Sequence, residues 1–198
     1  MTRIIAGHAR GRRLATPKGD ATRPTSDRVR ESLFSAVESL MGSLDGLRVL
    51  DLYAGSGALG LEAWSRGAAA VTLVESDKRT AALVQANARD LGCAVARVQA
   101  RTVGGFLAEP PPEPFDVVVS DPPYPLTEER LAEDLALLAA PGWLAPDALV
   151  VVERSRRSPE PTWPAGLARL GGRRGERRYG ETTLWFAEPV LAGAGDDR

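Results

Sequence analysis

One segment, residues 48–75, restricts the possible folds of this chain more than any other. It has the pattern of a buried strand at 48–53, a glycine-rich run at 55–60, a helix at 58–66 and a second strand at 71–75. The three glycines of the run follow the spacing G-x-G-x-x-G, which lets a backbone approach a ligand closely at the start of a helix. This order of elements predicts a parallel α/β unit that binds a nucleoside cofactor.

Two acidic residues flank the glycine-rich run. Asp51 lies near the carboxyl end of the first strand, and Glu75 ends the second strand 24 residues later. A carboxylate at position 75 is placed to bond ribose hydroxyls, which both NAD and S-adenosylmethionine carry. Asp51 would repel a pyrophosphate but attract a methionine ammonium, so Asp51 favours S-adenosylmethionine over NAD. The residues expected to bind this cofactor are Asp51, Tyr53, Ala54, Gly55, Ser56, Gly57, Glu75 and Ser76.

A second motif, Asp121-Pro122-Pro123-Tyr124, follows an apolar run at 115–120 and is called the acceptor loop below. A residue before proline is held extended, and proline has no backbone N–H. The loop therefore presents two acceptors, the Asp121 carboxylate and the Pro122 carbonyl, beside an aromatic ring. These groups suit the exocyclic amine of a nucleobase on which Tyr124 stacks. The alternative is a rigid loop that only closes a strand. All four residues are candidate catalytic residues.

The two motifs are expected at the same edge of one sheet. In an open α/β sheet, ligands bind outside the carboxyl ends of the strands, and both motifs follow such ends. Methyl transfer from a sulfonium to an amine needs little beyond alignment of the two groups. The residues therefore favour an enzyme that methylates an amine.

Four segments resemble one known family, the bacterial RsmD-type methyltransferases, which act on guanine N2 in small-subunit ribosomal RNA. They read RIIAG at 3–7, RPTSDRVRE at 23–31, DLYAGSGALGLEA at 51–63 and DPPY at 121–124, and the resemblance extends over residues 2–187. The last two occur in amino-methyltransferases generally, whereas the first two narrow the match.

The resemblance implies a Rossmann-like class I methyltransferase: a doubly wound, mostly parallel sheet of seven strands with an antiparallel last strand. It also implies S-adenosylmethionine as methyl donor, 16S rRNA as substrate and a 30S assembly intermediate as partner. One feature departs from the pattern: after the third strand, Ala100-Arg101-Thr102 stands where many such enzymes carry an acidic residue near the adenine.

Other activities fit less well. A DNA amino-methyltransferase acting on adenine N6 or cytosine N4 shares the acceptor loop but usually needs a target-recognition insertion, for which 198 residues leave little room. An enzyme that methylates a protein glutamine more often has Asn in place of Asp121. A non-catalytic RNA-binding subunit would be expected to lose the loop, and an NAD oxidoreductase would lack it.

The net charge of −1 hides an uneven distribution of charge. Residues 1–31 hold eight basic and three acidic groups, residues 154–178 hold eight and two, and residues 32–153 hold eight and 17. Basic flanks around an acidic centre suit a phosphate-binding surface beside a cationic cofactor, although the many arginines also fit a compositional bias of the genome. Whether 154–178 binds RNA stays open. The arginines expected to bind RNA are Arg3, Arg10, Arg12, Arg13, Arg23 and Arg28.

Along the chain we expect a basic N-terminal hairpin and arm at 1–24, a methyltransferase domain at 25–188 and a disordered tail at 189–198. Periodicity predicts further elements inside the domain. These are helices at 27–41, 77–91, 102–108 and 127–139, strands at 95–99, 115–120 and 148–153, a loop at 155–166 and a final antiparallel pair at 167–171 and 179–186.

The composition indicates which kinds of site the chain can hold and in which compartment we expect it. The chain has one cysteine, Cys93, and one histidine, His8, so a disulfide framework is impossible and no metal site is expected. Cys93 is expected to be a small apolar filler. No apolar run approaches 18 residues and no secretory signal is recognisable, so we expect a cytoplasmic protein that does not contact membranes. We also expect a monomer.

Overall fold

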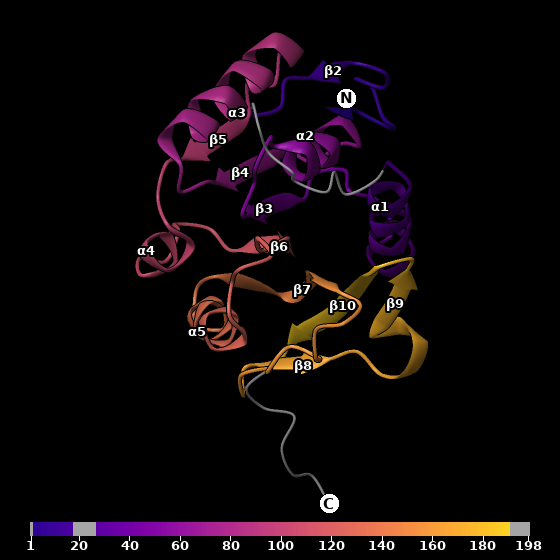
Figure 1. Ribbon diagram of the computed structural model, residues 1–198, viewed down its shortest axis with the longest axis vertical. Coiled ribbons are helices and arrows are strands. Elements are labelled where there is room, and N and C mark those ends of the chain that lie inside the picture. Colours follow the sequence, from indigo (N-terminus) through magenta and orange to yellow (C-terminus); the bar gives the residue numbers. More distant parts are fainter. Residues whose placement is uncertain (1, 18–26, 191–198) are drawn as a thin grey trace, which may run out of the picture.

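A computed structural model describes residues 2–17 and 27–190. The described chain forms one eight-stranded sheet flanked by helices and a small two-stranded hairpin (Figure 1). The strands of the large sheet are β3 (Arg48–Leu52), β4 (Ala70–Val74), β5 (Ala96–Gln99), β6 (Phe115–Ser120), β7 (Leu144–Ser155), β8 (Leu167–Arg169), β9 (Glu176–Tyr179) and β10 (Thr182–Pro189). The helices are α1 (Asp27–Met41), α2 (Ala58–Ser65), α3 (Lys78–Leu91), α4 (Val103–Leu107), α5 (Glu128–Leu138) and the 3-10 turn η1 (Gly172–Arg174).

The strand order places β3 and β6 next to each other inside the sheet. The order is β5-β4-β3-β6-β7-β10-β8, with β9 also paired to β10. The strands from β5 to β7 are parallel to one another, and β10 is antiparallel to β7. The chain therefore runs outward from β3 to β5 and then returns to the other side of β3 as β6. This reversal between β3 and β6 is the place where open α/β sheets bind ligands.

Each face of the sheet has its own apolar core. Val117 and Val119 of β6 pack with residues of α1, α2 and α3, while Val118 between them packs with residues of α4 and α5. Side chains alternate across a strand, so an unbroken apolar strand is buried on both faces. Figure 1 shows α4 and α5 on one side of the sheet and α1 on the other. The predicted Rossmann-like, doubly wound class is confirmed.

The N-terminal hairpin, residues 2–15, packs against the helices that follow the first two strands of the large sheet. Its strands β1 (Thr2–Arg3) and β2 (Arg13–Leu14) pair antiparallel. The backbone of the hairpin reaches α2, because the His8 N–H donates to the Ser65 carbonyl at 2.8 Å. Gly7 passes so close to α2 that a Cβ built on it would lie 1.7 Å from the same Ser65 oxygen. The hairpin is thus predicted correctly, and its contact with α2 was not foreseen.

The C-terminal part of the sheet differs in detail from the expected strands. The segment 179–186 is not one strand, because a turn at Gly180, with φ 55°, divides it into β9 and β10. Residues 176–179 read Glu-Arg-Arg-Tyr, a polar run without apolar alternation, so β9 was missed and the sheet has one strand more than the seven expected. β7 is longer than the predicted 148–153.

The termini are described only in part. β10 ends at Pro189, the first residue of the predicted tail. Residues 191–198 lie outside the described residues, as do residues 18–24 of the predicted arm, which include Arg23. Neither described stretch contains a helix long and apolar enough to cross a lipid bilayer.

The close approach at Gly7 gives a matched pair of variants. Gly7 and Gly11 both have positive φ, 78° and 83°, but a Cβ at Gly11 would meet no atom within 4 Å. Gly11→Ala should lose roughly 1–2 kcal/mol of unfolding free energy from the left-handed backbone alone. Gly7→Ala should lose more and expose the hairpin to protease, because its methyl group forces the hairpin away from α2. Denaturant unfolding and limited proteolysis measure both effects, and equal losses would contradict the docked hairpin.

Candidate cofactor and acceptor site

The pairing of β3 with β6 brings the two sequence motifs together. Leu52 pairs with Ser120 in parallel register, so Tyr53 and Asp121 both leave the sheet at the same edge. The Asp121 N–H lies 3.4 Å from the Leu52 carbonyl oxygen and continues the pairing. The glycine loop, residues 53–57, and the acceptor loop are therefore neighbours at the switch point, as expected from the sequence.

The glycine loop has three consecutive odd-numbered residues in left-handed conformations. Tyr53 has φ 64°, Gly55 has φ 55° and Gly57 has φ 82°. This conformation is easy for glycine but costs a tyrosine roughly 1–2 kcal/mol, and such residues cluster at functional sites. A Cβ on Gly55 would meet open space, whereas one on Gly57 would lie 2.9 Å from Val84 and one on Gly60 2.7 Å from Leu73. Gly55 thus leaves room for a ligand, and the other two allow close helix packing.

Asp51 is buried beneath this loop, with 1% of its surface exposed. Its Oδ2 accepts a hydrogen bond from the Gly60 N–H at 2.8 Å. Its Oδ1 is buried and has no hydrogen-bond partner among the described residues. Burial raises the pKa of Asp51 to about 8; the Gly60 bond opposes this rise, and the nearby Asp121 and Glu75 add to it. An unpaired carboxylate oxygen in this position fits a cationic ligand group.

Glu75 connects β4 to the glycine loop. Its Oε2 accepts from the Gly55 N–H at 3.0 Å and its Oε1 accepts from the Asp77 N–H at 2.8 Å. Each carboxylate oxygen has a second lone pair, so ribose hydroxyls can still bond to it. Asp77 in turn caps the N-terminus of α3, and Ser76 between them is exposed. The Ala54 N–H bonds to the β4 carbonyl of Val74 at 2.9 Å and is therefore already used within the fold.

Tyr53 makes a contact that the sequence did not reveal. Its hydroxyl donates a short hydrogen bond to the carboxylate of Asp134, a residue of α5 that is 2% exposed. Burial, and then this bond, raise the pKa of Tyr53. The ring packs with the apolar core on the α4 and α5 face, so we expect Tyr53 to contact the cofactor through its backbone. A signal was present, because Asp134 is an acid among the apolar Leu131, Leu135 and Leu138 of one helix face.

The acceptor loop presents one exposed ring above a fixed backbone. Pro122 is buried, Asp121 is partly buried, and Tyr124 is 76% exposed. The Leu126 N–H donates to the Pro123 carbonyl at 2.9 Å and turns the chain toward α5. A tyrosine this exposed buries little of its ring in the fold, which suits stacking on a base.

The two basic segments, the N-terminal one and residues 154–178, differ in how many of their arginines form ion pairs or other contacts within the protein. The described arginines of the N-terminal group are all exposed; they are Arg3, Arg10, Arg12, Arg13 and Arg28. Arg3 pairs with Asp27 at 3.0 Å, and Arg12 donates to the Asp90 carbonyl. Arg23 lies outside the described residues.

The 154–178 segment uses five of its eight arginines within the protein. Arg154 is buried and pairs with Glu128, and Arg169 pairs with Glu160 and Glu176. Arg178 also pairs with Glu176, and Arg177 lies over the ring of Phe186. These charges stabilise the C-terminal strands, so the N-terminal group is the better candidate for binding phosphate. Arg157 pairs with Glu181 at 4.0 Å but is exposed, as are the remaining arginines, Arg156, Arg173 and Arg174.

The turn after β5 has no carboxylate, as its sequence indicated. Thr102 caps α4 by accepting from the Gly105 N–H, and Arg101 donates to the Gly105 carbonyl. Cys93 is buried, and burial raises the pKa of its thiol to about 11, which disfavours the nucleophilic thiolate. Within residues 2–17 and 27–190, no group of three or more His, Cys, Asp and Glu side chains could hold a metal ion.

Comparison with known proteins places the chain in a family. A family model described as Conserved hypothetical protein 95 matches residues 2–188. The Ribosomal RNA small subunit methyltransferase D of Escherichia coli strain K12 is 42% identical over 163 residues, which cover 82% of this chain and 79% of that protein. The protein of the same name from Haemophilus influenzae is 42% identical over 161 residues, covering 79% and 80%.

A solved structure agrees over nearly the whole chain. The structure of the Escherichia coli protein yhhF is 36% identical, has a TM-score of 0.81 and covers 96% of this chain and 98% of its own. The extent of these matches confirms the resemblance found in the sequence. This chain belongs to the Conserved hypothetical protein 95 family, the RsmD-type methyltransferases.

Proposed function

We propose that this protein transfers a methyl group from S-adenosylmethionine to the N2 amine of a guanine in small-subunit rRNA. The observation that carries the proposal is the meeting of the glycine loop and the acceptor loop at the switch point between β3 and β6. One loop supplies a site for a cationic nucleoside cofactor and the other a site for a planar amine. The names of the relatives support ribosomal RNA of the small subunit as the substrate.

The cofactor would lie across the glycine loop. The unpaired Oδ1 of Asp51 would accept a hydrogen bond from the methionine ammonium, and Glu75 would bond the ribose hydroxyls. The open space beside Gly55 would let the cofactor lie close to the backbone of the loop. When bound, S-adenosylmethionine supplies a methyl group on a positively charged sulfur. The residues of the protein need only orient it, because the sulfonium is already a reactive donor.

The acceptor loop would orient the amine. The Asp121 carboxylate and the Pro122 carbonyl would accept its two hydrogens, which leaves the nitrogen lone pair directed toward the methyl group. Tyr124 would stack on the guanine after the base has been flipped out of its surroundings. No general base is needed, because the methylated amine can lose its extra proton to water.

The proposal extends to the particle that is methylated, the oligomeric state of the protein and the compartment in which it acts. We infer a 30S assembly intermediate as the natural substrate, because an embedded guanine must be reachable for its base to flip. We further propose that the protein acts as a monomer in the cytoplasm, where such particles assemble.

The first prediction of this proposal concerns Asp121. Asp121→Ala should lower turnover by about two to three orders of magnitude, the scale seen when one transition-state hydrogen-bond partner is removed. Affinity for S-adenosylhomocysteine should change much less, because cofactor contacts come from the neighbouring loop. The assay follows transfer of label from S-adenosylmethionine to small-subunit rRNA, with DNA and protein as competing acceptors. Activity within a few-fold of wild type would show that the amine lies elsewhere.

Tyr124 supplies the matched control for the same assay. Tyr124→Phe keeps the ring and should remain within a few-fold of wild type, whereas Tyr124→Ala should raise the KM for RNA. If DNA were labelled in preference to rRNA, the substrate class would be DNA and the proposal of rRNA would be wrong.

Asp51 predicts a pH dependence of cofactor affinity. With a pKa near 8, its carboxyl is protonated at lower pH in the free protein, whereas an ammonium bound beside it favours the ionised form. Binding should therefore release a proton, and affinity should rise by up to about tenfold per pH unit below pH 8 and level off above it. Asp51→Asn, which keeps an oxygen for the Gly60 N–H, should bind more weakly at pH 8 and lose this dependence. Calorimetry with S-adenosylhomocysteine from pH 6 to about 8.5 measures both; a flat wild-type profile would remove Asp51 from the ammonium site.

The N-terminal arginines predict a salt dependence of RNA affinity. Replacing Arg10, Arg12 and Arg13 with Ala should weaken RNA binding and reduce the slope of log affinity against log salt by about 0.7 for each phosphate that the variant no longer binds. The hairpin backbone is held by α2 and α3, so these changes should leave cofactor affinity intact. Replacing Arg156, Arg157, Arg173 and Arg174 is the matched control. An unchanged slope in the first variant and a reduced slope in the second would move the RNA surface to the C-terminal strands.

A further inference from the structure

One buried side chain connects the N-terminal hairpin to the glycine loop. Asn87 lies in the C-terminal half of α3 and is 3% exposed. Its Nδ2 donates to the Ser56 carbonyl and to the Ala15 carbonyl, both at 2.9 Å. Its Oδ1 accepts from the Ala15 N–H, also at 2.9 Å. A single amide therefore contacts both the hairpin and the glycine loop.

The oxygen of the Asn87 amide accepts one hydrogen bond and its nitrogen donates two. Asp and Leu have a similar shape, but neither can both accept and donate in this way. The Ala15 backbone bonds to both the oxygen and the nitrogen of Asn87, which fixes the plane of the amide. The remaining hydrogen of Nδ2 then points at Ser56, in the middle of the loop expected to bind the cofactor. Since all three partners are backbone groups, their positions depend directly on one another.

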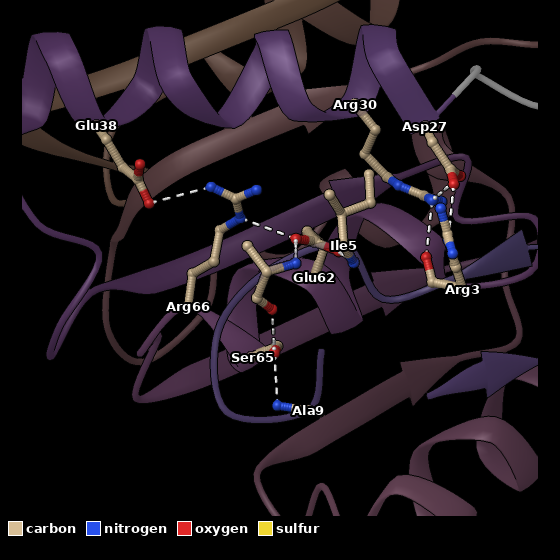
Figure 2. A network of polar contacts seen from close by, with 10 residues as sticks. Arg3, Ile5, Ala9, Asp27, Arg30, Glu38, Glu62, Ser65 and Arg66 are labelled. Atoms are coloured by element: carbon tan, nitrogen blue, oxygen red, sulfur yellow. Dashed lines mark hydrogen bonds and ion pairs between the residues drawn. The ribbon is translucent and has the colours of Figure 1, made fainter. Parts of the chain in front are cut away.

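The other hydrogen bonds of the hairpin within the described residues do not reach the glycine loop. Figure 2 shows Glu62, Ser65 and Arg66 of the α2 region facing the hairpin and α1. Glu62 accepts from the N–H groups of Ile5 and Ala6 at 2.7 and 2.9 Å, and Ser65 accepts from the Ala9 N–H at 2.9 Å. Among the hydrogen bonds of the described residues, those of Asn87 alone join the hairpin to the glycine loop.

We propose that Asn87 is a positioning residue that couples RNA binding on the hairpin to cofactor binding at the glycine loop. The inference rests on the proposed function, in which the hairpin arginines contact RNA. RNA held by the hairpin favours its docked position, and docked Ala15 orients the Asn87 amide. That amide holds the Ser56 carbonyl and with it the left-handed turns at Gly55 and Gly57. Cofactor and RNA therefore bind with positive coupling, and each raises the affinity of the other by the same factor.

A purely structural role predicts something else. If Asn87 only fills space and satisfies backbone groups, its loss lowers stability and weakens both ligands, but the ratio of affinities with and without the second ligand is unchanged. The coupling factor is therefore the quantity that separates the two roles.

The test measures this factor by calorimetry on the full chain. The affinity of S-adenosylhomocysteine is measured with and without saturating transcribed small-subunit rRNA, and the affinity of the rRNA with and without S-adenosylhomocysteine. For the wild type we expect the same factor of about five or more from both directions, the usual lower range of allosteric coupling. Asn87→Asp keeps the shape and the acceptor but removes both donors, and its factor should fall close to one.

Ser65→Ala is the matched control, because it loosens the hairpin without touching the glycine loop. It should bind RNA more weakly and keep the wild-type factor. Asn87→Ser, too short to reach either carbonyl, should also give a factor near one and replaces Asn87→Asp if that variant does not fold. A wild-type factor near one, or an unchanged factor in the Asn87 variants, would overturn the coupling. Absence of any rRNA binding or methylation would instead overturn the proposed function.

Discussion

The parallel pairing of β3 with β6 determines where the chemistry of this protein can take place. Leu52 and Ser120 lie opposite each other, so the next residues of both strands leave the sheet at one point. Because the chain has turned back at this position, no crossover helix covers the space above the two strand ends. A loop rich in glycine lies on one side of that space and a loop rich in proline on the other. The first leaves open space beside Gly55, and the second presents mainly acceptors.

Three carboxylates, those of Asp51, Glu75 and Asp121, lie around this point. Bringing negative charges together costs free energy, and the surrounding groups must offset that cost. Asp51 and Glu75 each accept a backbone N–H from the glycine-rich run, which ties left-handed residues such as Gly55 to the ends of β3 and β4. Asp121 and Glu75 nevertheless raise the pKa of the buried Asp51. An arrangement that disfavours its own negative charge gains most from a cation, and a sulfonium ligand with an ammonium group provides that charge. The electrostatics of the site thus agree with the cofactor that the family uses.

Local patterns were enough to predict the site loops but not what supports them. The glycines and Asp121 follow strands whose apolar runs are unmistakable, so their placement needed only the strand-end rule. The partners of Asp134 and Asn87 could not be assigned from the sequence, because Tyr53 and Ser56 lie 81 and 31 residues away. A polar residue on an apolar helix face signals a buried partner, but the sequence does not say which one. For the same reason a count of arginines could not separate Arg154, which is buried in an ion pair, from an exposed one.

The hairpin shows how a short basic segment acquires a fixed place on the fold. Two strands of two residues each cannot form a stable unit alone, so the hairpin depends on acceptors from elsewhere. Glu62 and Ser65 supply them from α2, and Asn87 supplies them from α3. These two helices begin directly after Gly57 and Asp77, so their N-terminal ends border the proposed cofactor site. The distance between the hairpin and the glycine loop is therefore set by helices that both contact, and in the proposed function these helices would hold RNA bound on the hairpin in register with the acceptor loop.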